Sequence, residues 1–128
     1  MAFSFHAGVV HCDRLCRRLS FADRDDNSSE HYFIMDRSED SPVDAEPDME
    51  NVYIERDDQQ WGGFGGIERV VLHRNSLTLF LSPRMAKQMG EHDSIRIEFA
   101  TNQHEFREMQ HVLGLIMRGY ESQLKLLS

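Results

Sequence analysis

Seven histidines and two cysteines are the side chains of this sequence best suited to bind a metal. The histidines are His6, His11, His31, His73, His92, His104 and His111. None of them forms a His-x-x-x-His pair, the helical spacing that lets two imidazoles hold one ion. His104 and His111 are two helical turns apart, about 10 Å by the helical rise, which is too far to share a metal. The nearest approach to a ligand cluster is His11 with Cys12 and Cys16, and we expect no metal site.

Phosphate-binding and catalytic motifs are also missing from the pattern. The glycine-rich residues 61–66, WGGFGG, lead into Ile67 and a strand-like run without the lysine of a phosphate loop. No Gly-x-Ser-x-Gly nucleophile motif occurs. The many carboxylates lie in a solvated run where nothing separates their pKa values into an acid and a base. We therefore predict no catalytic residue and no cofactor.

Acidic residues are concentrated in one part of the chain. The 128 residues carry a net charge of −8, and residues 23–58 hold 14 acidic and three basic residues, a net −11. The remaining 11 basic and 8 acidic residues give +3. The centre of the band, with Pro42 and Pro47, predicts an exposed acidic loop at about residues 36–50. This loop is either a solvated segment or a surface for a cationic partner, and the acidic balance argues against direct nucleic-acid binding.

The hydrophobic pattern predicts one α+β domain spanning residues 1–128. Its second half predicts a hairpin from Ile67–His73 and residues 77–81, and a short helix between Pro83 and Gly90. A half-buried strand at residues 95–99 and a final helix starting near Asn102 follow. The stripe of Phe106, Met109, Leu113 and Ile116 predicts that this helix packs on one face of an antiparallel sheet.

The remaining segments are less regular. Residues 3–12 are predicted to form one strand, residues 31–35 and 51–56 are strand candidates, and residues 61–66 form a turn or loop. Trp61 and Phe64 in that loop either fold back onto the core or project as anchors for a partner. The tail, residues 119–128, is interpreted as a flexible extension or as a segment docked through its leucines.

The composition indicates a cytoplasmic protein. Two cysteines fit a reducing compartment, and we interpret them as ordinary thiols rather than a disulfide. No apolar run approaches the roughly 18 residues of a membrane-spanning helix. The first residues lack a basic region followed by an apolar stretch.

Several segments from Val52 onward carry a family resemblance. They are Tyr53-Ile54-Glu55, Asp58-Gln59, Phe64-Gly65-Gly66-Ile67, the run LHRNSLTLFL at residues 72–81, strand residues 95–99 and the final helix with Phe106 and Leu113. In these segments the chain resembles the Immunity protein 10 family of bacterial polymorphic toxin systems. The resemblance implies a protein without enzymatic activity that binds a cognate secreted toxin domain inside the producing cell and blocks it.

The segment from Asn51 to Phe64, with the acidic loop before it, is the partner surface that we predict. The charge band, the two aromatic residues and the most specific family motif meet there. The predicted contact residues are Glu50, Tyr53, Glu55, Asp57, Asp58, Gln59, Trp61 and Phe64. Many toxin domains act on nucleic acid, so we expect the partner to be basic.

Two other classes of function stay open on the sequence, and so does a homo-oligomer. The acidic face could serve an adaptor or a subunit of a larger assembly. A small-ligand or metal-binding enzyme would require a convergent polar pocket.

Overall fold

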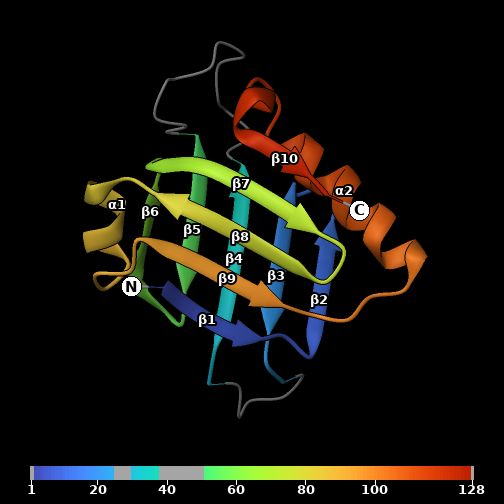
Figure 1. Ribbon diagram of the computed structural model, residues 1–128, viewed down its shortest axis with the longest axis horizontal. Helices are drawn as coiled ribbons and strands as arrows, with labels where there is room; N and C mark the ends of the chain where they lie inside the picture. The colour runs from blue at the N-terminus through green and yellow to red at the C-terminus, as the bar shows by residue number, and fades with distance from the viewer. Residues whose placement is uncertain (1, 25–29, 38–50, 128) are drawn as a thin grey trace.

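Two five-stranded sheets form the framework of the molecule (Figure 1). The computed structural model describes residues 2–24, 30–37 and 51–127. In chain order the elements are β1 (Ala2–His6), β2 (Val9–Asp13), β3 (Arg18–Ala22), β4 (Tyr32–Arg37), β5 (Val52–Arg56), β6 (Asp58–Phe64), β7 (Ile67–His73), β8 (Ser76–Leu81), α1 (Pro83–Gln88), β9 (Ser94–Glu98), α2 (Gln103–Ile116), the 3-10 helix η1 (Glu121–Gln123) and β10 (Leu124–Leu126).

The predicted α+β class is confirmed, and its strands are divided between two sheets. One sheet, which we call the meander sheet, runs β2-β3-β4-β5-β6 with every pairing antiparallel. The other, the mixed sheet, has the order β1-β9-β8-β7-β10. Its β7–β8 hairpin and β9 pair antiparallel, while the two edge strands pair parallel, β1 with β9 and β10 with β7.

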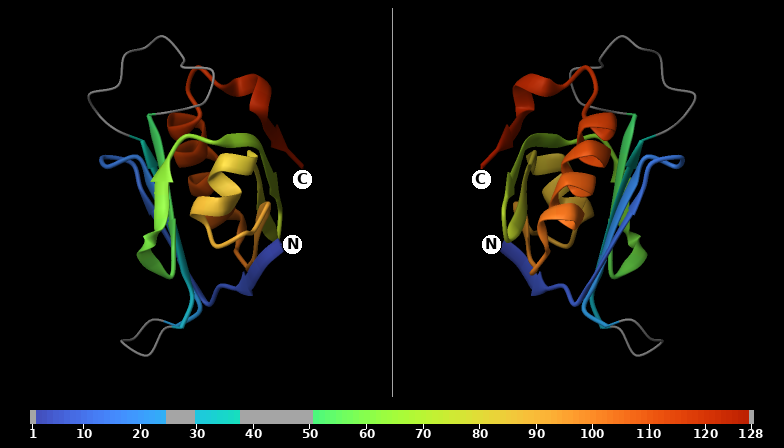
Figure 2. Two further views of the ribbon diagram at one scale, coloured as in Figure 1. Left: turned by 90° about the vertical axis from the view of Figure 1, so that its left-hand side faces the viewer. Right: turned by 90° about the vertical axis from the view of Figure 1, so that its right-hand side faces the viewer.

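The core lies between the two sheets, whose strands cross steeply (Figures 1 and 2). Alternate residues of each strand point into it, so β9 buries Ile95 and Ile97 and exposes Arg96 and Glu98. The short helix α1 closes one side of the sandwich and α2 closes the opposite side (Figure 2). Among the described residues, neither helix is both long and apolar enough to cross a membrane.

Both helices begin as their sequences predict. The side chain of Ser82 accepts a hydrogen bond from the amide of Met85 at the start of α1, and Pro83 occupies the first turn. Gly90 follows the helix with a φ of 83°. Asn102 and Glu105 form the predicted capping box of α2. The buried stripe of α2 is Phe106, Met109, Val112, Leu113 and Ile116, as the helical spacing predicts.

The first predicted strand, residues 3–12, is two strands. β1 belongs to the mixed sheet and β2 to the meander sheet, so the chain changes sheet at Ala7 and Gly8. A Cβ atom on Gly8 would lie 2.7 Å from the carbonyl oxygen of Asp23. The chain can therefore cross between the sheets at this close approach because the residue has no side chain.

The prediction of a turn or loop at the glycine-rich residues 61–66 is wrong for residues 61–64. Residues 61–64 belong to β6, and the turn is confined to Gly65 and Gly66, with φ angles of 75° and 72°. β6 is the edge strand, and α1 lies against it. The side-chain amide of Gln88 donates to the carbonyls of Gln60 (3.4 Å) and Gly62 (2.9 Å), and Arg84 donates to that of Phe64 (3.2 Å).

The tail is docked through residue 127. Buried Tyr120 donates a hydrogen bond to the side chain of Asn51, and β10 pairs with β7. Arg37, at the end of β4, is buried and donates to the carbonyls of Ile116 and Arg118 at the end of α2. The first two residues of the predicted acidic loop, Asp36 and Arg37, end β4, and the rest of that loop, residues 38–50, lies outside the described residues.

Candidate partner-binding site

The predicted contact residues divide between the two faces of the meander sheet. Strand alternation places Tyr53, Glu55 and Phe64 on the outer face, which the helices and the mixed sheet leave uncovered in the described part of the chain (Figure 2). Trp61 lies on the inner side. Asp57 forms the connection between β5 and β6, and Asp58 and Gln59 begin β6. Glu50 lies outside the described residues.

Glu55 is held by two tyrosine hydroxyls on the outer face. The hydroxyl of Tyr53 donates to Oε1 at 2.6 Å, and that of Tyr32, from the neighbouring strand β4, donates to Oε2 at 2.5 Å. We call these three residues the Glu55 clamp. Glu55 is only 9% exposed, although no described element lies above it, so the flanking side chains themselves bury the carboxylate.

The clamp requires a glycine on the adjacent strand. Gly62 on β6 lies directly opposite Glu55, and a Cβ atom there would lie 2.5 Å from the Tyr53 hydroxyl oxygen. Without that Cβ, the tyrosine extends across β6. Its ring also packs against Phe64, with centroids 5.0 Å apart and planes tilted by 56°. Phe64 remains 52% exposed, so the clamp is bordered by an open aromatic surface.

The clamp changes the acidity of its tyrosines. Burial, followed by the hydrogen bond to Glu55 and its charge, raises the pKa of Tyr53 to about 12. The same causes, in the same order, raise the pKa of Tyr32 above its ordinary value near 10.

Alkaline titration should reveal this shift. Because the folded-state pKa values are raised, the stability contributed by the neutral tyrosines is present below pH about 10 and is lost as the pH rises toward 12. We expect at least two of the three tyrosines to ionise above the ordinary value when tyrosinate absorbance is followed. In Glu55→Gln the Tyr53 transition should move downward, and an unchanged transition would contradict the clamp.

On the inner side, Trp61 folds back on the core. The Arg56 guanidinium lies between two rings, 4.6 Å from the Phe3 centroid and 5.0 Å from the Trp61 centroid. Its Nε and Nη2 atoms donate to the carbonyl of Met89 at 3.0 and 2.8 Å. The sequence left two alternatives for the aromatic residues: Trp61 folds back onto the core, and Phe64 is exposed.

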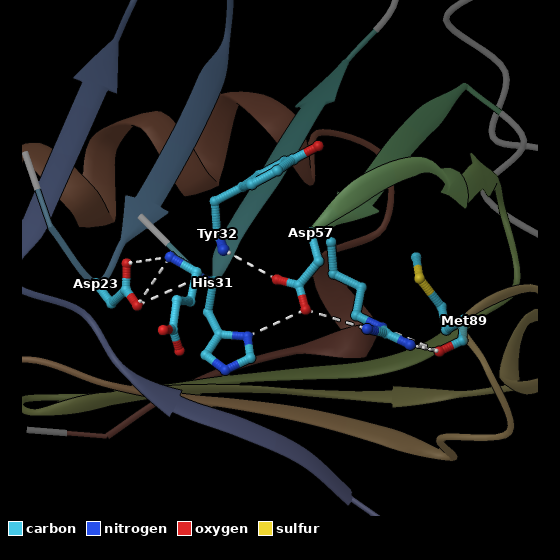
Figure 3. A network of polar contacts seen from close by, with 7 residues as sticks. Asp23, His31, Tyr32, Asp57 and Met89 are labelled. Carbon is cyan, nitrogen blue, oxygen red and sulfur yellow. Dashed lines mark hydrogen bonds and ion pairs between the residues drawn. The ribbon is translucent and has the colours of Figure 1, made fainter. Parts of the chain in front are cut away.

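Asp57 is engaged inside the chain. It adopts a φ of 62°, and Oδ1 accepts from the amide of Tyr32 at 3.0 Å. Oδ2 lies 3.1 Å from both His31 Nδ1 and Arg56 Nη1 (Figure 3). These contacts connect β4, the β5–β6 connection and, through Arg56, the end of α1. Asp58 and Gln59, by contrast, are exposed.

Tyr32 and Arg56 are site residues that the sequence analysis did not select. No local pattern marks Tyr32, because the short run HYFIM at residues 31–35 does not alternate between apolar and polar side chains, and only the register of β4 on β5 places Tyr32 on the face of Tyr53. The outer face also carries Asp36, paired with Arg18 at 3.0 Å.

The structure assigns no metal centre to the residues that it describes. Within them no group of three or more His, Cys, Asp or Glu side chains could hold an ion, and no disulfide joins Cys12 to Cys16. Two surface hollows lie elsewhere, one beside Arg74 and Phe106 and the other beside Pro83 and Lys87. Neither hollow is lined by the clamp residues.

Comparison with known protein families identifies a match to this chain. A family model described as Immunity protein 10 matches residues 6–107, which include all the described residues of the predicted contact set. A search of curated proteins finds no match to the chain.

Proposed function

Because the chain belongs to the Immunity protein 10 family, we propose that it binds and neutralises a cognate secreted toxin domain in the cytoplasm of the cell that produces both. In this role the chain acts by occupying a surface of the toxin and performs no catalysis of its own. Family membership supports a toxin as the partner in general. The choice of contact surface and the basic character of the partner are our inferences.

The outer face of β4, β5 and β6 is the observation that carries the proposed surface. It carries half-buried Tyr32 and Tyr53 and half-exposed Phe64, and aromatic side chains of this kind are enriched at the centre of protein interfaces. The strand β5 also follows directly on residues 38–50, which contain six acidic residues and no basic one. A basic toxin surface would be attracted to this region.

The direct test is protection of cells. Expression of the toxin domain encoded beside this chain should arrest growth, and co-expression of the chain should restore it. Binding kinetics of the purified pair should show association that slows as salt is raised. If the pair neither binds nor protects, the proposed function with this toxin fails, and the alternative of an acidic adaptor in another assembly is favoured.

Phe64 is expected to act as an interface anchor. Phe64→Ala should speed dissociation from the toxin and weaken binding by about 2 kcal/mol, the usual effect of removing a central aromatic. Phe80→Ala is the matched control, because Phe80 is 42% exposed but lies on β8 in the mixed sheet. Equal effects of the two substitutions in surface-bound kinetic measurements would move the interface away from the meander sheet.

A further inference from the structure

We propose that the Glu55 clamp is a receptor for an arginine side chain of the partner, a specific contact that rests on the proposed function only for the identity of that partner. The guanidinium would hydrogen-bond to the Glu55 carboxylate and lie against the Tyr53 and Phe64 rings. This assignment names the chemistry that the outer face recognises, beyond a general attraction between charges.

Glu55 lacks a counter-charge within the described residues. Glu55 is 9% exposed, and both hydrogen-bond partners of its carboxylate oxygens are neutral hydroxyls. Within the described residues no Lys, Arg or His forms an ion pair with it. The internal segments outside the described residues, 25–29 and 38–50, contain no Lys, Arg or His at all. A buried carboxylate without a cation is costly, and binding a cation offsets that cost.

The Glu55 carboxylate has hydrogen-bonding capacity that its two tyrosine partners do not use. A carboxylate can accept about four hydrogen bonds, and the two tyrosines provide one to each oxygen. The tyrosines also fix the orientation of the carboxylate, so a partner would find it already in position. Two acceptor sites match the paired N–H groups of a guanidinium better than the single point charge of lysine.

An aromatic surface lies next to the carboxylate. The Tyr53 and Phe64 rings are in contact, and Phe64 is exposed. Guanidinium groups stack on aromatic faces, and this attraction adds to the ion pair. The chain itself contains this combination on the inner side of the same strands, where Arg56 lies between Phe3 and Trp61 and contacts Asp57. On the outer face the rings and the carboxylate are present, no described Arg, Lys or His pairs with that carboxylate, and we assign the guanidinium to another molecule.

A purely structural clamp is the alternative, and it makes different predictions. In that case replacement of Glu55 would change the stability of the free protein and leave recognition unaltered. A receptor for arginine predicts a larger effect on binding than on stability, because Glu55→Gln keeps the shape, removes the charge and replaces one acceptor oxygen by an NH2 group.

The first experiment measures binding to the toxin domain encoded beside this chain. We expect Glu55→Gln to weaken binding about 100-fold, mainly through faster dissociation, as when a desolvated charge pair loses one partner. Asp58→Asn removes the same charge from an exposed position on the next strand and should change the affinity by less than about fivefold, through slower association. If the wild-type chain binds the toxin but the two substitutions change the affinity equally, the arginine receptor is overturned and the proposed function remains intact.

The second experiment does not depend on the toxin. Titration of the isotope-labelled chain with N-acetyl-arginine methylamide should give saturable amide shifts at Tyr32, Tyr53, Glu55 and Gly62 in nuclear magnetic resonance spectra. The corresponding lysine compound should give smaller shifts, and Glu55→Gln should abolish the response while Asp58→Asn retains it. Absence of shifts at these residues, or an unchanged response in Glu55→Gln, would refute the proposal even if the chain had no toxin partner.

Discussion

Arg56→Ala is expected to lower the free energy of unfolding by about 3–5 kcal/mol, the range observed when one partner of a buried charged network is removed. The arginine is 9% exposed and makes three hydrogen bonds, two to the Met89 carbonyl and one to Asp57. Its removal also leaves a void between the Phe3 and Trp61 rings. The loss should appear as a lower midpoint in urea denaturation.

Arg18→Ala is the matched control for this change. Arg18 also pairs with an aspartate, Asp36, but its side chain is 48% exposed. Exposed pairs contribute about 0–1 kcal/mol, so this variant should unfold almost as the wild type does. If Arg56→Ala were no more damaging than Arg18→Ala, the Arg56 network would not hold the two sheets and α1 together.

Leu113→Ala is expected to cost about 2–5 kcal/mol, because the large side chain is fully buried and its loss leaves a cavity between α2 and the sheets. Phe106→Ala, on the same stripe, should fall in the same range. Leu15→Ala is the control, since Leu15 is 89% exposed. A denaturation midpoint in Leu113→Ala equal to that of the control would show that the helix does not pack as described.

The elements that could be predicted from sequence are those specified by neighbouring residues. The β7–β8 hairpin follows from two alternating runs separated by Arg74 and Asn75. The limits of α1 follow from Pro83 and Gly90, and the start of α2 follows from its capping box. Each signal lies within a few residues of the element that it controls, so no knowledge of distant contacts is needed.

The features that could not be predicted depend on distant contacts. Nothing within residues 3–12 indicates that Phe3 pairs with Ile95 while Val10 pairs with Phe21, and this difference divides one run between two sheets. The glycines of β6 have low strand propensity, yet the observed position of Tyr53 requires a glycine at Gly62, where a Cβ atom would lie 2.5 Å from the tyrosine hydroxyl, and a Cβ atom at Gly63 would lie 3.3 Å from Met85.

The sequence predicts the candidate site as one continuous segment, whereas in the structure the side chains of that segment point to opposite faces of the meander sheet. A bulge at Glu55 and Arg56, followed by the positive φ of Asp57, shifts the alternation between β5 and β6. As a result Trp61 and Asp57 make contacts within the chain, whereas Tyr53, Glu55 and Phe64 face outward. Tyr32 joins them through the register of β4 on β5, a pairing that no local pattern specifies.

The contacts between α1 and β6 have a consequence for self-association. The carbonyls of residues 60, 62 and 64 point to the same side of the edge strand, and Gln88 and Arg84 occupy all three. An unprotected strand edge is a template on which other chains add strands, ultimately as fibrils. With these acceptors occupied from within, β6 resists such polymerisation. We therefore expect a partner to engage the flat face of this strand through its side chains and not to pair with these carbonyls.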